Sequence, residues 1–386
     1  MARTTEHTQY GMTHETLGSL FAISDGMSYA WTAPMIPYLI SDRSHIKTTL
    51  AEAEWLETIL MMGALCGLPT TIYLVDKIGR KRSLLLASFT MILAWSTIAL
   101  GPNIIYLYVA RFFSGMAGDM AFVAAPMYVA EIADREIRGF LSGIIYLMML
   151  IGCIIMYSVG PYFPFYVVSI VGCSVTLLEP NINVDEEILE ISKAIERQKT
   201  ERGRILDLFV IPSNRKGMLI MTVLNGGQHL CAISVILMNL HLILEAAGSI
   251  YIDSSQAAII FSVVMLIAAA FASLQVDKYG RKVLLITSSI LTGCCLLALA
   301  IYFNLKITGY DNILNVSWIP IVSVMIYAAV FKIGMGIVPI IVTAEIFPAK
   351  MKAIGMTVAD AMLTVQTTYK NYVSIEYYTE NYSNLS

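Results

Sequence analysis

The chain of 386 residues has little charge: Asp, Glu, Lys and Arg together make up 14% of it, while apolar and aromatic side chains make up 57%. Soluble domains carry roughly 25% charged residues, so this composition argues against a soluble protein. The apolar residues come in runs of about 18 or more, the length that a helix needs to cross a membrane. Because a helix satisfies its own backbone in lipid, we expect an all-α, multi-pass membrane protein.

Patterns that carry reaction chemistry are also lacking. The six cysteines fall inside apolar runs, with no pairing pattern and no metal spacing. No nucleophile with its base, no phosphate-binding loop and no interleaved basic and aromatic surface is found. We therefore expect no enzyme, no catalytic residue, no metal, no cofactor and no nucleic-acid partner. A signal peptide is not expected either, because the first apolar run is too long and no small-residue cleavage site follows it.

Ten apolar runs are clear spans, and an eleventh stretch at 353–373 is more polar. Lys and Arg of the loops fall almost entirely on one side, which places that side and the N-terminus in the cytosol. The expected partners are the lipid bilayer and a small molecule; the oligomeric state is left open. The spans are expected at 17–40, 55–75, 83–101, 103–128, 140–158, 161–178, 217–243, 255–275, 283–303 and 317–343.

An internal repeat divides the chain into two parallel halves. Residues 75–88 read VDKIGRKRSLLLAS and residues 276–289 read VDKYGRKVLLITSS, each between two spans. We expect an N-terminal six-helix bundle over 1–180, a cytosolic linker with a short amphipathic helix over 181–216, and a C-terminal bundle over 217–386 that ends before a twelfth span.

Each repeated turn contains a glycine, Gly79 or Gly280, that permits a tight bend between two helices. Asp76 and Asp277 are placed to accept hydrogen bonds from a neighbouring helix N-terminus. The alternative for one copy alone is an ordinary positive-inside turn. Two copies at matching places favour a shared function.

Further motifs follow in the spans. They are GMSYAWTAP at 26–34, RFFSGMAG at 111–118, the P-x-Y-x-x-E spacing of Pro126, Tyr128 and Glu131, and AEIFP at 344–348. Together they resemble the sugar porters of the major facilitator superfamily, and most of all a shortened insect facilitated trehalose transporter. The resemblance implies the major facilitator fold, with two pseudo-symmetric bundles and about 10 to 11 of the usual 12 transmembrane helices.

The resemblance also implies a function, facilitative transport of trehalose or a hexose by alternating access, with the plasma membrane as the location. Bases of the cytosolic turns would pair with acids to close that side, or would merely be solvated there. The implied gating residues are Asp76, Gly79, Arg80, Lys81, Arg111, Glu131, Arg138, Asp277, Gly280, Arg281, Lys282, Glu345 and Lys352.

The implied sugar site departs from the family pattern. Gln228 is the one strong sugar ligand of the family pattern that this chain retains, whereas Tyr146 stands where the family has a glutamine. His229, Ser234 and Asn239 replace a second glutamine, an asparagine and an aromatic residue, and Trp31 completes the expected substrate-binding set. These losses leave open an alternative, a non-transporting sugar-porter-like sensor or a regulatory, truncated isoform.

Asp25, Asp119 and Lys332 are singled out among the charges within spans, where a charge costs about 2.5–3.5 kcal/mol and suggests function. Asp119 and Lys332 occupy equivalent positions in the two halves, so they either pair across the cavity or face water separately. Asp25 is either part of a proton-coupling pair with His229 or a polar residue beside Gly26. Asn315 starts a sequon in an outward-facing loop and is a plausible glycosylation acceptor.

Overall fold

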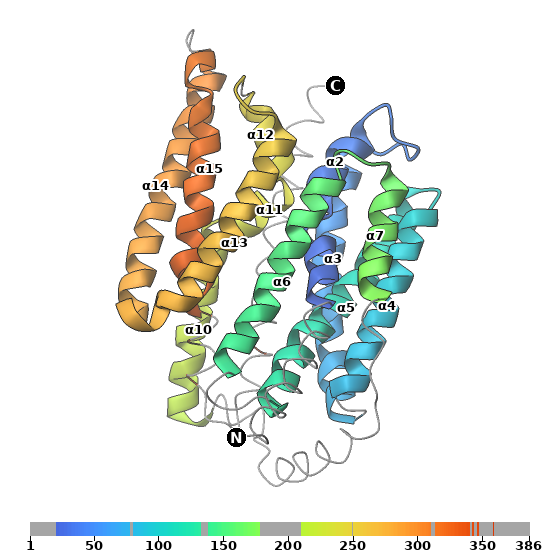
Figure 1. Cartoon of the computed structure of the whole chain (residues 1–386), viewed down its shortest axis with the longest axis vertical. Helices are drawn as coiled ribbons and strands as arrows, with labels where there is room; N and C mark the ends of the chain where they lie inside the picture. The colour runs from blue at the N-terminus through green and yellow to red at the C-terminus, as the bar shows by residue number, and fades with distance from the viewer. Residues whose placement is uncertain are drawn as a thin grey trace, which may run out of the picture.

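The structure, a computed structural model, describes residues 21–77, 80–132, 138–177, 210–248, 250–309 and 313–339, together with residues 342, 346 and 358. Within this part it contains helices and turns and no strand. The helices gather into two groups, one formed by α2–α7 and the other by α10–α15, which stand side by side (Figure 1). The all-α architecture with two bundles is therefore confirmed.

Helices of the first half follow the expected spans closely. Residues 21–30 are helical and lead, through Trp31, into α2. The others are α2 (Thr32–Ile40), α3 (Leu50–Lys77), α4 (Arg80–Leu100), α5 (Ile104–Ile132), α6 (Arg138–Val159) and α7 (Phe165–Leu177).

The helices of the second half are interrupted more often than those of the first. They are α10 (Pro212–Leu230), α11 (Ile233–Met238), α12 (Leu240–Ala247), α13 (Ser254–Tyr279), α14 (Arg281–Ile307), the short 3-10 helix η1 (Ile313–Val316), α15 (Trp318–Phe331) and the π-helix η2 (Lys332–Gly336). The expected eleventh span lies outside the described residues, apart from residue 358. The expected domain boundaries fall near or inside the undescribed stretch 178–209 and stay a prediction.

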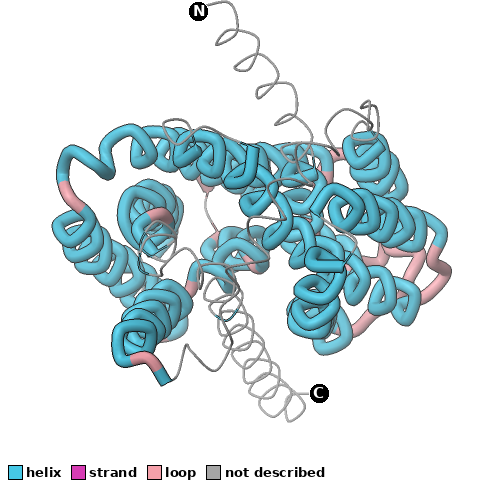
Figure 2. The backbone as a smooth tube through the Cα atoms, turned by 90° about the horizontal axis from the view of Figure 1, so that it is seen from below, coloured by secondary structure: helices cyan, strands magenta, loops and turns pink. Residues whose placement is uncertain are grey.

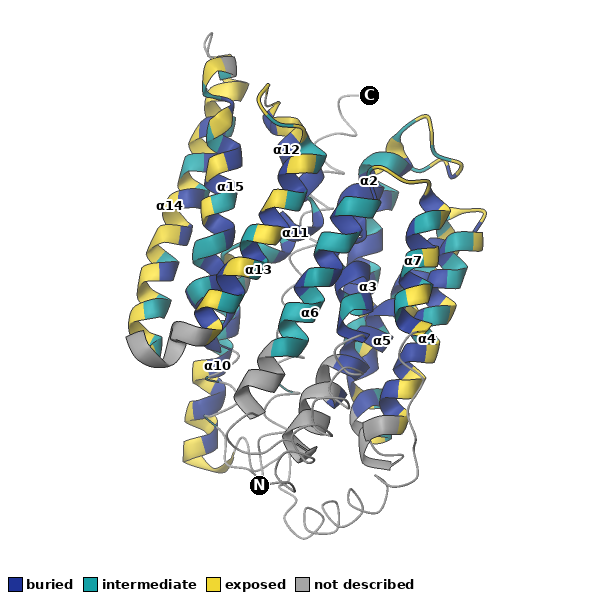
Figure 3. Ribbon diagram, in the orientation of Figure 1, coloured by how far each residue is buried: buried dark blue, intermediate teal, exposed yellow. Residues whose placement is uncertain are grey.

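Five described segments are long and apolar enough to cross a membrane by length and composition: Arg82–Leu100, Pro212–Met238, Ser254–Ser273, Arg281–Ile307 and Trp318–Gly336. Large apolar side chains are exposed along outer helix faces, including Leu297 and Ile301 of α14 and Phe89 of α4. Figure 3 shows exposed positions, in yellow, along the outer helices of both groups, and buried positions, in dark blue, where helices pack together. Such an apolar outer surface suits contact with lipid.

The span expected over 217–243 is interrupted at Ala232 and again at Asn239. Ala232 has φ 61°, a left-handed conformation that costs an L-residue roughly 1–2 kcal/mol and ends the α-helical hydrogen-bond ladder. Hydroxyls of two other helices donate to carbonyls next to these breaks: Tyr327 to the Cys231 carbonyl and Tyr157 to the Leu237 carbonyl, both at 2.7 Å. These bonds satisfy backbone groups that lipid would leave unpaired.

Helices α3 and α5 pack in close backbone contact through two glycines. A Cβ on Gly63 would lie 2.1 Å from the Phe112 carbonyl oxygen, and a Cβ on Gly115 would lie 2.0 Å from the Leu60 carbonyl oxygen. Small residues of this kind let membrane helices approach closely. The first bundle is therefore held together partly by backbone proximity, and Figure 2 shows its helices tightly grouped when viewed from below.

Candidate functional site

A π-helical turn lies where the two bundles meet. It spans Lys332–Gly336 in η2, directly after α15. Gln228 of α10 donates from Nε2 to the Met335 carbonyl oxygen at 2.5 Å and approaches the Gly336 carbonyl oxygen at 3.4 Å. On the other side, Ser288 of α14 accepts from the Met335 amide at 3.1 Å. A π turn leaves carbonyls available to partners outside its own helix, and such turns occur often at functional sites.

Lys332 begins this turn and reaches across to the first bundle. Its ammonium donates a hydrogen bond to the hydroxyl of Tyr146 on α6 and lies 4.6 Å from the centre of the Tyr146 ring. The lysine is buried, with 4% of its surface exposed. This contact joins one side chain from each half of the chain.

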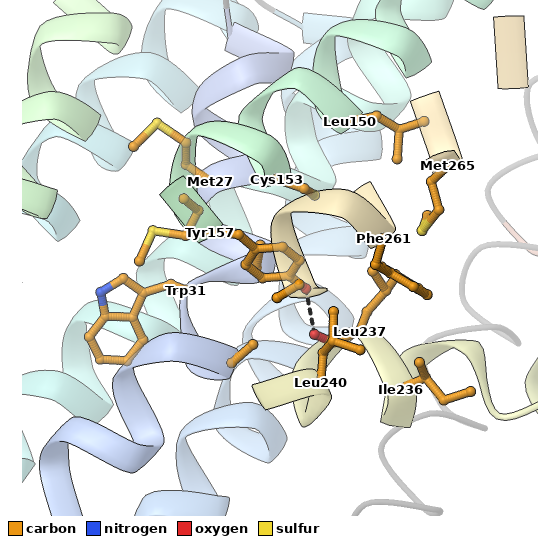
Figure 4. Packing of buried hydrophobic residues seen from close by; sticks show 14 of the residues in the cluster. Met27, Trp31, Leu150, Cys153, Tyr157, Ile236, Leu237, Leu240, Phe261 and Met265 are labelled. Carbon is orange, nitrogen blue, oxygen red and sulfur yellow. Dashed lines mark hydrogen bonds between the residues drawn. The ribbon is translucent and has the colours of Figure 1, made fainter. Parts of the chain in front are cut away.

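A second set of contacts between the halves involves α11 and the break at Asn239. Tyr157 of α6 donates to the Leu237 carbonyl, as Figure 4 shows with a dashed line. Tyr29 and Ser234 hydrogen-bond through their side chains. Asn239 donates a side-chain hydrogen bond to Glu57 of α3. Tyr157, Tyr29 and Glu57 thus come from three different helices of the first half.

Arg111 of α5 is fully buried inside the first bundle. Its Nη1 donates to the Ser28 carbonyl oxygen at 2.6 Å, and its guanidinium lies 5.3 Å from the centre of the Trp31 ring. Glu57 and Asp25 interact with it electrostatically. The buried arginine thus ties α5 to the first helix and compensates acidic charge within the bundle.

Two family models cover the chain almost from end to end. Residues 174–373 match the model described as "Sugar (and other) transporter", and residues 18–179 match that of the Major Facilitator Superfamily. This chain belongs to the sugar transporter family. The resemblance inferred from the motifs is confirmed.

Several curated relatives of this sugar transporter family member carry specific names. The facilitated trehalose transporter Tret1 of Polypedilum vanderplanki is 28% identical over 86% of this chain and 73% of its own length. The transporter of the same name in Drosophila virilis is 26% identical over 90% of this chain, which spans only 41% of that relative. The bovine "Solute carrier family 2, facilitated glucose transporter member 8" is 25% identical over 87% of this chain and 79% of its own length.

Solved structures of similar shape are also sugar transporters. The crystal structure of a D-xylose-proton symporter matches with a TM-score of 0.75 at 18% identity, covering 95% of this chain and 89% of that one. The inward open conformation of the xylose transporter XylE from E. coli matches with a TM-score of 0.73, also at 18% identity, over 95% and 90% of the two chains. At this identity the similarity shows the major facilitator fold.

Of the residues expected to bind a sugar, the structure places three in contacts between the halves: Tyr146, Ser234 and Asn239. Gln228 instead bonds to the Met335 carbonyl within the second half. Trp31 is different, because it is fully buried in the first bundle and packs edge-on against Phe165 at 6.2 Å. The His229 side chain lies outside the described residues. A binding role for each of these residues stays a prediction.

The intramembrane charges have separate partners. Asp119 accepts a hydrogen bond from Thr71 at 3.0 Å, whereas Lys332 donates to Tyr146. Asp25 packs against Gly118, where an added Cβ would lie 2.3 Å from its Oδ1. The structure therefore gives Asp119 and Lys332 different partners in place of the cross-cavity pair that their matching depth suggested.

Of the residues expected to form a gate, the structure describes the side chains or backbone of Gly280, Arg281, Lys282 and Arg111. Gly280 has φ 79°, so its turn does require glycine, as expected. Arg281 and Lys282 follow it at the start of α14. Gly79 and the side chains of the remaining gating residues lie outside the described part: Asp76, Arg80, Lys81, Glu131, Arg138, Asp277, Glu345 and Lys352.

Asn315 lies in the short helix η1 and is exposed, as a glycosylation acceptor must be. Its glycosylation stays a prediction.

The sequence patterns did not single out Glu57, although it lies within the span expected over 55–75 and is 5% exposed. The rule that intramembrane ionisable residues suggest function would have found it. Tyr157 and Tyr29 were also overlooked, because a tyrosine in a span carries no comparable signal.

Proposed function

We propose that this chain is a facilitative carrier that moves a sugar, trehalose or a hexose, across the plasma membrane by alternating access. The observation that carries the proposal is the meeting of Gln228 and Tyr146, one from each half, around the π turn Lys332–Gly336. Names of the curated relatives support the same substrate class. The N-terminus and the bases of the repeated turns face the cytosol in this proposal.

Sugar hydroxyls require neutral hydrogen-bond donors and acceptors, and the apolar face of a sugar ring packs well on an aromatic side chain. Gln228 offers an amide, and Tyr146 offers both a hydroxyl and a ring. In the described conformation these groups bond to protein atoms. A bound sugar would take over those bonds, so that its binding opens contacts between the bundles.

Alternating access needs contacts between the halves that break easily. The bond from Tyr157 to Leu237 and the side-chain pairs Tyr29–Ser234 and Glu57–Asn239 are of this kind. A hydrogen bond contributes a net 0.5–1.5 kcal/mol or so between neutral groups and about 1.5–3 kcal/mol when one group is charged. Three such bonds hold one conformation without making it permanent.

The test is to express the tagged chain in a host that lacks sugar transporters and to measure trehalose and glucose uptake together with surface delivery. We expect saturable uptake. Gln228→Ala should lower uptake by about tenfold, since a lost hydrogen bond of roughly 1.4 kcal/mol corresponds to that factor.

Gln256→Ala is the matched control, because Gln256 is an exposed amide near the start of α13. Its uptake should equal that of the wild type. Protein that reaches the surface but gives no saturable uptake of any sugar would refute the transport proposal.

A further inference from the structure

Lys332 is an unusual residue for a site that binds neutral sugars. It is a cation in the tenth span, with only 4% of its surface exposed. Placing such a charge within the bilayer costs about 2.5–3.5 kcal/mol on the insertion scale, and intramembrane charges commonly lie on substrate pathways. A purely structural contact to a tyrosine could be made by a neutral side chain without this cost.

The contacts described for the Lys332 ammonium are aromatic. Its ammonium contacts the hydroxyl and the ring of Tyr146, and lies 5.8 Å from the centre of the Phe331 ring. Cation–π contacts of this kind contribute about 0.5–2 kcal/mol. They solvate the cation without neutralising it.

Acidic side chains described in the spans are engaged with other groups. Asp119 bonds to Thr71, Glu57 to Asn239, and both Glu57 and Asp25 interact with the buried Arg111. The hydrogen bond shown for the Lys332 ammonium goes to the phenol of Tyr146. A ligand that enters between the bundles can compete with this phenol for the ammonium.

Further polar groups gather at the same π turn. Gln228 bonds to the Met335 carbonyl three residues after Lys332, which brings an amide to the turn. The Tyr146 hydroxyl, once released by the ammonium, can donate a hydrogen bond. An ammonium, a phenol and an amide together match a sugar that has hydroxyls and one carboxylate.

We propose that the preferred substrate is a hexuronate, a hexose in its acid form, whose carboxylate binds Lys332 between the two bundles. The inference rests on the proposed function and narrows its substrate class. A charge-assisted hydrogen bond is roughly twice as strong as a neutral one. The carboxylate would replace Tyr146 as the partner of the ammonium, which frees Tyr146 for a sugar hydroxyl.

The test uses the full chain purified in detergent, with thermal unfolding followed by intrinsic fluorescence. D-Glucuronate, D-glucose and D-glucose 6-phosphate are titrated as sodium salts or with sodium chloride at equal ionic strength. We expect glucuronate to stabilise the wild type at concentrations about tenfold lower than glucose requires. Lys332→Arg should retain this preference and Lys332→Met should lose it, while half-saturation by glucose changes less than threefold.

Lys306→Met is the matched control. Lys306 lies in the last turn of α14 and donates to the Ala246 carbonyl. This variant therefore also removes one lysine charge, but at a site away from the π turn. It should keep the preference for glucuronate. If Lys332→Met does not fold, the comparison of glucuronate with glucose on the wild type still decides the question.

Equal half-saturation by glucuronate and glucose in the wild type would overturn the inference, as would equal behaviour of Lys332→Met and Lys306→Met. Binding of glucose 6-phosphate as tight as that of glucuronate would replace a carboxylate site with a general anion site. Absence of any uptake together with intact glucuronate binding would refute transport and leave the hexuronate as a bound ligand of this site, no longer a substrate.

Discussion

Close packing of α3 against α5 makes Gly115 a sensitive position. A Cβ added there would lie 2.0 Å from the Leu60 carbonyl oxygen and 2.8 Å from the Ala64 amide nitrogen. Real Cβ contacts are essentially never shorter than 3.0 Å, so Gly115→Ala must push the two helices apart by about 1 Å. Both obstructing atoms belong to the backbone, so no side-chain rotation relieves the clash.

Gly293→Ala in α14 is the control, because a Cβ there meets nothing within 4 Å. Both variants gain roughly 1 kcal/mol of helix propensity. Gly115→Ala also incurs an overpacking penalty of about 1–3 kcal/mol and loses Cα–H···O contacts of about 0.5–1 kcal/mol. The two variants should therefore differ by about 1.5–4 kcal/mol in the free energy of unfolding, with Gly115→Ala the less stable.

The assay is unfolding of both variants by dodecyl sulfate in mixed micelles, followed by tryptophan fluorescence. A lower midpoint for Gly115→Ala than for Gly293→Ala is the expected order. Coincident transitions would refute the reasoning, because they would mean that α3 and α5 separate at no cost.

Two further predictions concern hydrogen bonds. Hydrogen bonds from the amide and hydroxyl of Thr49 hold the pKa of Glu52, in the first turn of α3, below its usual value. The stability from this depressed pKa is present above the unfolded pKa of about 4.3 and is lost as pH falls through the folded one. Glu52→Gln should thus lower the melting temperature slightly at pH 7, and its difference from the wild type should shrink as pH falls below about 4.3; a constant difference from pH 7 to pH 3.5 would contradict this. Tyr157→Phe removes the bond to the Leu237 carbonyl and should destabilise the protein by about 0.5–1.5 kcal/mol, seen as a lower melting temperature, and an unchanged melting temperature would show that the carbonyl finds another donor.

The spans could be predicted from the sequence because lipid imposes a simple rule: apolar runs of sufficient length become helices. The predicted positions of the helix ends were less accurate. α3 begins at Leu50 and not at 55, since Thr49 and Glu52 form a reciprocal capping box. The spacing of a threonine followed three residues later by a glutamate is visible in the sequence and would have corrected the boundary.

Interruptions within spans could not be predicted in the same way. The left-handed Ala232 and the break at Asn239 depend on hydroxyls of Tyr327 and Tyr157, which lie 96 and 80 residues away from the carbonyls they bond. A local pattern contains no information about such distant donors. The π turn after α15 likewise depends on Gln228, more than a hundred residues earlier in the chain.

Two departures from the family pattern turn out to be a single feature. Read alone, Tyr146 is a lost sugar ligand and Lys332 is an unexplained charge, and equal depth suggested Asp119 as the partner of the lysine. Depth along a helix does not determine which helix a side chain faces, however. In the structure the Lys332 ammonium donates to the Tyr146 hydroxyl. A phenol stabilises an ammonium without neutralising it, so this pairing holds the two bundles in contact while the lysine keeps its charge. In the proposed hexuronate site, the two substitutions that remove ligands for a neutral sugar supply the ammonium and the phenol that an acidic sugar would use.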